Sequence, residues 1–308
     1  MTPTNNWIVS TYIYLIGFFY CIFRLDIPEL IAKGDIYSYF GVYGGVKMEN
    51  LTDWFSIEVL LPFFYTVLRP LLGRINIEEF AEFQLFLVYS ILGYALLKSS
   101  KGAAQYAVLI LMLDIPALPH LARQFVSAAF VLLALVETYS KRRLGVTAIL
   151  IGISALSHLT GPLFFLMAII FTKLQSYHLR LMLLGAALLA LTGTVVNSIT
   201  LLNQLHGVPV FGKAFFALEV YLSSGGSNPR FFSVVGAFIM VLFPARDWQE
   251  KVTAGFLALT IAVYQLPILN ARVGLIGSSV LIGLPFFLLS RYLVAFLAVS
   301  AKPRSVPK

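Results

Sequence analysis

The chain has 308 residues, of which 59 % are hydrophobic and only 12 % are charged, and its mean hydropathy is +0.87. A soluble domain carries about 25 % charged residues, so this composition excludes a soluble globular protein. The formal net charge of +8 indicates basic loops beside anionic lipid rather than a nucleic-acid-binding surface. The apolar runs are continuous, which excludes the alternating strands of an outer-membrane barrel.

These runs predict an all-α, polytopic integral membrane protein with a single transmembrane domain over 1–308. A helix needs about 20 mostly apolar residues to cross a bilayer. We expect ten spanning helices, at 8–24, 80–97, 104–119, 121–139, 144–158, 160–173, 179–199, 230–245, 252–269 and 273–291. The first lacks a basic leader and a small-residue cleavage site, so we interpret it as an uncleaved span. The run 57–72 contains Pro62 and Pro70, which bend a helix, and is expected to dip into one leaflet.

Basic residues predict the orientation of these helices. With both termini in the cytoplasm, the short cytoplasmic loops hold most of the Lys and Arg residues, including the cluster 141–143. The longer segments 25–79 and 200–229 then lie on the outer face, where we expect them to cover an active site. The chemistry is therefore expected at or just below the outer face of the membrane.

Arginines at the predicted outer face are the first candidate site residues. Arg24, Arg123, Arg230 and Arg272 lie at the ends of apolar runs, and a guanidinium offers a planar fork of donors that fits phosphate oxygens. We expect these four to bind a diphosphate. Arg123 and Arg272 are favoured, because their apolar flanks supply no local carboxylate. The alternative for each is a side chain that reaches up to lipid headgroups.

The segment 34–45 (GDIYSYFGVYGG) follows the first span. Tyr37, Tyr39 and Tyr43 could stack on sugar rings and hydrogen-bond their hydroxyls. An ordinary interfacial aromatic belt is the alternative for the tyrosines, although it explains Asp35 less well.

Three residues are candidates for acid–base chemistry at the outer face. His158 lies between two apolar helices, and its reference pKa of about 6.5 suits a base that activates a sugar hydroxyl. We therefore rank His158 first as base, Asp35 second, and Glu58 as a structural or acceptor-positioning acid. A histidine with a purely structural role, and a glutamate favoured by a helix dipole, are the alternatives. No P-loop, HExxH or paired metal-binding carboxylate motif occurs, so neither a metal nor another cofactor is expected.

The order of these motifs resembles the EpsG/Wzy group of bacterial polysaccharide polymerases. The matching residues, in chain order, are Arg24, Asp35, Tyr37, Glu58, Arg123, Gln124, His158, Thr160 and Arg272. The resemblance implies a GT-C-like glycosyltransferase of the bacterial inner membrane that joins repeat units of O-antigen, capsule or exopolysaccharide on the periplasmic face. Both substrates would be linked to undecaprenyl diphosphate. We also expect Gln124 to bind sugar, and we expect a chain-length regulator protein as partner and no nucleic-acid partner.

Other membrane functions stay open. A flippase or transporter for lipid-linked oligosaccharide should place cationic and aromatic residues along a path through the bilayer centre, whereas here they gather at one face. An O-antigen ligase uses related chemistry and is the hardest to separate. A membrane O-acyltransferase would use a buried histidine such as His158.

Overall fold

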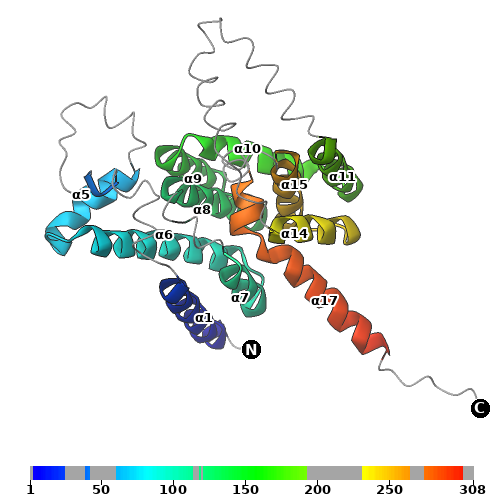
Figure 1. Ribbon diagram of the computed structural model, residues 1–308, viewed down its shortest axis with the longest axis horizontal. Coiled ribbons are helices and arrows are strands. Elements are labelled where there is room, and N and C mark those ends of the chain that lie inside the picture. Colours follow the sequence, from blue (N-terminus) through cyan, green and yellow to red (C-terminus); the bar gives the residue numbers. More distant parts are fainter. Residues whose placement is uncertain are drawn as a thin grey trace, which may run out of the picture. The chain divides into compact units, whose positions relative to one another are not determined.

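The structure is a computed structural model that describes residues 3–24, 39–41, 60–113, 118, 121–192, 231–263 and 274–300 (Figure 1). Every regular element in these ranges is helical, so the all-α fold class is confirmed for them. The chain divides into two compact units, Met1–Ile170 and Phe171–Lys308. Each unit is described by itself, and a single transmembrane domain over 1–308 stays a prediction.

The first unit is organised around one buried helix, α8. Its elements are α1 (Pro3–Arg24), α5 (Leu60–Leu72), α6 (Ile77–Ser99), α7 (Ala103–Leu111), α8 (Ala122–Val136), the π-helical turn η2 (Glu137–Lys141), α9 (Leu144–Ser157) and α10 (Thr160–Lys173), which continues into the second unit. Nearly every side chain of α8 is buried, and the helix packs against both α6 and α9 (Figure 1). A helix that is apolar all round needs such cover from neighbouring helices or lipid.

Local sequence signals explain where several of these helices begin and end. Asn76 caps α6 and forms a capping box with Glu79. Gly73 ends α5 with a φ of +73° and donates its N–H to the Arg69 carbonyl at 2.9 Å, as a left-handed helix C-cap does. Pro62 lies in the first turn of α5, where a missing N–H costs little.

Small polar residues hold α8 against α9. The Ser127 and Ser154 hydroxyls lie 2.8 Å apart, and Ser154 donates to the Ser127 carbonyl at 2.9 Å. Gly161 of α10 packs on the same pair, since a Cβ atom there would lie 2.5 Å from the Ser127 hydroxyl. Such close, hydrogen-bonded contacts are typical of helices that pack within membranes.

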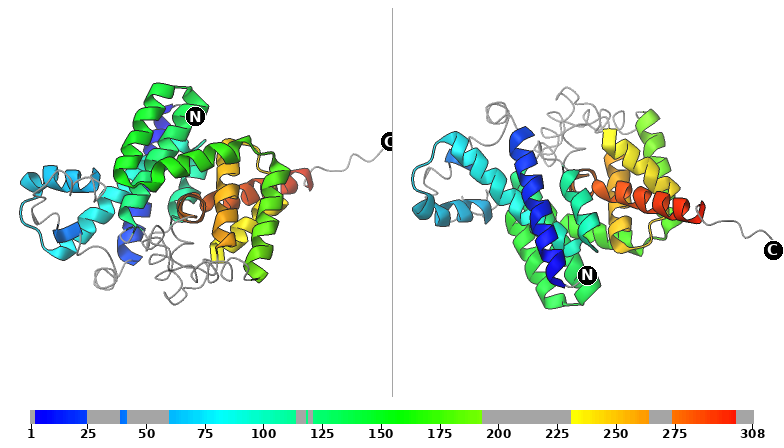
Figure 2. Two further views of the ribbon diagram at one scale, coloured as in Figure 1. Left: turned by 90° about the horizontal axis from the view of Figure 1, so that it is seen from above. Right: turned by 90° about the horizontal axis from the view of Figure 1, so that it is seen from below.

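The second unit is organised around α15 (Trp248–Ala262). Its other elements are α11 (Ser176–Thr192), α14 (Phe231–Leu242), the π-helical turn η4 (Ile276–Val280) and α17 (Gly283–Ser300). α15 is buried along most of its length and contacts all four (Figure 2). Lys251 donates to the Thr172 carbonyl at 3.1 Å, and Arg180 to the Leu242 carbonyl at 3.0 Å, so backbone carbonyls at helix ends are satisfied by basic side chains.

A glycine makes the contact between η4 and α15 possible. A Cβ atom at Gly277 would lie 2.9 Å from the Leu257 backbone nitrogen and 2.8 Å from the Phe256 Cβ. We expect Gly277→Ala to destabilise the protein by about 1–3 kcal/mol, because backbone cannot move aside cheaply. Gly185→Ala is the matched control, since a Cβ atom there meets nothing within 4 Å. Thermal unfolding in detergent should show a lower midpoint for the first variant only. Equal midpoints would contradict this close approach.

Two described helices, Ile77–Ser99 and Ala122–Lys141, are long and apolar enough to cross a membrane. Six shorter apolar helices accompany them, at Ile8–Tyr20, Leu144–Ser157, Thr160–Lys173, Ser176–Thr192, Phe231–Leu242 and Gly283–Ala298. The predicted layout of ten spans is therefore supported only in part by the described residues.

Three of the predicted spans are wrong as single helices. The span 252–269 ends as helix α15 at Ala262, because Val263 leaves the helical conformation. The span 104–119 ends as helix α7 at Leu111. A helix that continued to Pro116 would lose the hydrogen bond to the Met112 carbonyl and would bring the proline ring against it. The span 273–291 contains a break, since η4 ends at Val280 and α17 begins only at Gly283 and continues to Ser300. Arg291, predicted to end a span, therefore lies inside a helix.

Candidate functional site

Four predicted site residues have described side chains, and they lie in two neighbouring contacts at the start of α8. These residues are Tyr39, Arg123, Gln124 and His158. Six others, Asp35, Tyr37, Tyr43, Glu58, Arg230 and Arg272, lie outside the described residues, as do the predicted cover 200–229 and most of 25–59. Arg24 is the last residue of α1, and its side chain is outside the described part.

Arg123 is held by an aromatic pair. Its Nε donates to the Tyr39 hydroxyl at 2.8 Å, and its Cζ lies 5.4 Å from the centroid of the same ring. Tyr39 in turn packs edge-on against Tyr65 of α5, with centroids 6.4 Å apart. A guanidinium that is hydrogen-bonded and lies near an aromatic ring loses rotamer freedom, so its remaining donors are oriented in advance.

The next residue along α8 contacts the predicted base. Gln124 is 3 % exposed, and its amide nitrogen lies 3.4 Å from His158 Nε2. His158 follows the last residue of α9, and its Nδ1 lies 2.7 Å from the Thr160 hydroxyl. The Thr160 backbone N–H also donates to Nδ1, at 3.2 Å. The imidazole therefore caps the first turn of α10 while it faces Gln124.

These contacts determine the tautomer of His158. Because Nδ1 accepts the Thr160 N–H, the proton of a neutral ring must lie on Nε2. Gln124 should then present its oxygen to this proton, and that orientation also satisfies Gln124 Oε1, which otherwise has no partner among the described residues. In this state His158 donates from Nε2 and has no unoccupied ring nitrogen with which to accept a proton.

Two of the four residues, Tyr39 and Gln124, are predicted to bind sugar, and these roles stay predictions. Tyr39 is 5 % exposed, and its ring lies beside Arg123. Gln124 is turned toward His158 within the protein. In the described arrangement both residues position other side chains.

Tyr65 of α5 also belongs to this site, and its sequence pattern does not mark it. Its side chain is fully buried beside Tyr39, and its hydroxyl has no hydrogen-bond partner among the described residues. A buried polar group without a partner is uncommon and needs an explanation. The available signal was the pair Tyr65-Thr66, whose hydroxyls lie within the apolar run LLPFFYTVL of α5.

In comparisons with protein families, curated proteins and solved structures, no match to this chain is found.

Proposed function

We propose that this chain is an integral membrane glycosyltransferase of the bacterial inner membrane that polymerises undecaprenyl-diphosphate-linked oligosaccharides. The observation that carries the proposal is the arrangement at the start of α8, where Arg123 is oriented by Tyr39 and Gln124 contacts His158. Each contact joins segments far apart in the sequence. Together they gather a guanidinium and polar hydrogen-bonding groups at one end of an apolar helix.

Exposed apolar side chains support the membrane setting. Leu159 and Leu144 are 76 % and 73 % exposed, and large apolar side chains also lie exposed along α10, α11 and α17. Exposed apolar surface on this scale is costly in water and is expected where lipid covers the protein. A lipid-linked substrate could then keep its polyprenyl tail in the bilayer while its diphosphate reaches Arg123.

In the proposed reaction, an acceptor sugar hydroxyl attacks the anomeric carbon of the donor. The bond from this carbon to the diphosphate oxygen breaks, and the undecaprenyl diphosphate leaves with the bonding electron pair. Arg123 stabilises the charge that develops on the diphosphate, with Arg272, Arg230 and Arg24 as further candidates. A general base removes the hydroxyl proton as the new glycosidic bond forms.

The described geometry of His158 changes the expected order of the bases. Its Nδ1 accepts from Thr160, and its Nε2 carries the proton, so we assign it a positioning role. Asp35 then ranks first as base, and Glu58 remains an acceptor-positioning acid.

The direct test is transfer by the purified chain in lipid nanodiscs that contain undecaprenyl-diphosphate-linked repeat units. We expect products of two or more repeat units on a gel. A matched preparation of Arg123→Ala separates catalysis by this site from a contaminating activity. Equal elongation by both preparations would contradict the proposal. The proposal would also be wrong if neither preparation elongated the lipid-linked repeat units that the native cell makes.

We also expect this transfer to proceed without a divalent metal, because fixed arginines can neutralise a diphosphate leaving group. Polymer formation in EDTA should equal that in magnesium. Loss of activity in EDTA, with recovery when magnesium is added back, would contradict this expectation.

A further inference from the structure

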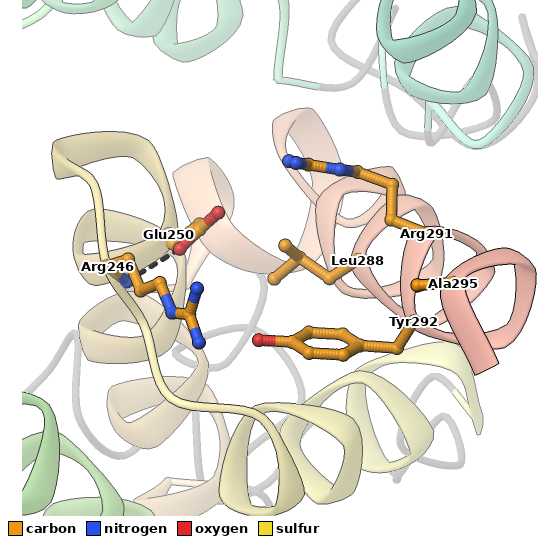
Figure 3. A pocket seen from close by; sticks show the side chains of 6 residues that line it. All are labelled: Arg246, Glu250, Leu288, Arg291, Tyr292 and Ala295. Atoms are coloured by element: carbon orange, nitrogen blue, oxygen red, sulfur yellow. Dashed lines mark hydrogen bonds between the residues drawn. The ribbon is translucent and has the colours of Figure 1, made fainter. Parts of the chain in front are cut away.

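A pocket of about 180 Å³ in the second unit is lined by two arginines from different elements. Arg246 lies in the turn before α15, and Arg291 lies beside Tyr292 on α17 (Figure 3). Leu288 and Ala295 lie one turn before and after this pair, so all four α17 residues share one face of the helix. A water molecule occupies about 30 Å³ in the liquid, so the pocket has room for a polar group of several atoms.

The two arginines bring uncompensated positive charge to this pocket. Neither forms an ion pair within the part of the chain that the structure describes, where the salt bridge joins Lys141 to Glu137. Both are exposed, and the hydrogen bond from Arg246 to Glu250 uses its backbone N–H, which leaves the guanidinium out of that contact. Two like charges that line one pocket repel each other, and a bound anion would remove this repulsion.

The carboxyl group of Glu250 lines the same pocket, but the cap of α15 uses it. Its Oε2 accepts the backbone N–H groups of Arg246 and Asp247, at 2.6 and 3.3 Å, and it shares a side-chain hydrogen bond with Asp247. Burial is the main cause that raises the pKa of Glu250, and the neighbouring Asp247 carboxylate raises it further. The neutral carboxyl is therefore favoured, and the two guanidinium groups dominate the charge of the pocket.

Packing orients the donors that face this space. Tyr292 stacks on Phe243, with ring centroids 4.4 Å apart, and its hydroxyl points toward the Arg246 side chain (Figure 3). The Arg291 guanidinium lies 5.9 Å from the Phe287 ring and is directed over the pocket (Figure 3). Two guanidinium forks and one phenolic hydroxyl are therefore available to a ligand with several acceptor oxygens.

We infer that this pocket binds the dianionic phosphate group of a small soluble phosphomonoester. A guanidinium offers its N–H groups in a planar fork that matches phosphate oxygens, and one dianion balances the charge of two arginines. A monocarboxylate balances only one of them. The site uses none of the residues assigned to the proposed transfer. Arg246 and Arg291 both lie on the predicted cytoplasmic side, and on that prediction the ligand comes from the cytoplasm.

The test titrates the purified full-length chain, in phosphatidylcholine nanodiscs, with soluble anions by calorimetry. Glycerol 3-phosphate and inorganic phosphate should bind saturably, whereas succinate, a dianion with two carboxylates, should bind at least tenfold more weakly. Equal binding of succinate would mean a general anion site and would overturn the inference. Failure of both phosphates to saturate would overturn it as well.

A second comparison separates a soluble phosphate from a lipid headgroup. Nanodiscs that contain phosphatidic acid should bind glycerol 3-phosphate as tightly as nanodiscs that contain phosphatidylglycerol, which has a similar surface charge. Weaker binding with phosphatidic acid alone would mean that a lipid phosphate occupies the pocket, and the inference would be wrong.

Variants assign the binding to the pocket. Arg246→Gln and Arg291→Gln should each weaken glycerol 3-phosphate at least tenfold, because each removes a charged fork. Tyr292→Phe, which keeps the ring, should weaken it by a smaller factor. Arg143→Gln, an exposed arginine outside the pocket, is the matched control and should leave binding unchanged. Unchanged binding by either pocket variant would overturn the inference. The assay measures binding alone, so its result is independent of any glycosyltransferase activity.

Discussion

Arg123→Ala should reduce polymer formation by about 100-fold or more, because it removes a preoriented cation from the place where leaving-group charge develops. Arg123→Lys should restore little of this loss, since an ammonium cannot reproduce the planar fork or the Nε bond to Tyr39. Surface polysaccharide from cells that make equal amounts of each variant is the measurement. Near-normal polymer from either variant would remove Arg123 from the reaction.

Tyr39→Phe should be measured beside Arg123→Ala. It keeps the ring beside Arg123 and removes only the hydroxyl that accepts the hydrogen bond from Arg123 Nε. We expect a loss of about tenfold, the scale of one hydrogen bond to a charged group. A loss as large as that of Arg123→Ala would instead mean that Tyr39 itself contacts the substrate.

Asp35→Asn should lower the transfer rate by about 10² to 10⁴, the usual contribution of a positioned general base. His158→Gln should cost about tenfold, because glutamine can still hydrogen-bond to Gln124, although it loses the contact with Thr160. The two variants are compared for rate at saturating substrate and equal expression. If His158→Gln is inactive while Asp35→Asn still polymerises, His158 is the base and the order proposed here is reversed.

The helices that sequence reasoning located best have local signals at both ends. The predicted span 160–173 coincides with α10, which begins after His158 and ends at Lys173, before the short connection 174–175. The span 273–291 failed, because hydropathy does not reveal a π-helical turn. That turn depends on the close approach of Gly277 to the α15 backbone, which is a tertiary contact.

At the candidate site, too, the sequence predicted individual residues but not the contacts between distant ones. Sequence pattern selected Arg123, Gln124 and His158 by residue type and position. It could not give the contacts of Arg123 with Tyr39 or of Gln124 with His158, because each pair is brought together only by folding. The tautomer of His158 likewise depends on where the Thr160 N–H points.

Long-range packing also changed the interpretation of two basic residues. In the predicted layout, Arg246 follows the span 230–245 and Arg291 ends the span 273–291, both on the cytoplasmic side. The structure places both around one pocket with Glu250, which hydropathy and charge counts could not reveal.

The central claim, that this chain polymerises lipid-linked repeat units, is tested most directly by deleting its gene and separating surface polysaccharide on a gel. We predict that the ladder of long chains collapses to a single repeat unit, and that the unchanged gene restores the ladder while Arg123→Ala does not. Complete loss of surface sugar would indicate a flippase or a ligase, and an unaltered ladder would exclude any role in polymer assembly. Either result would contradict the account.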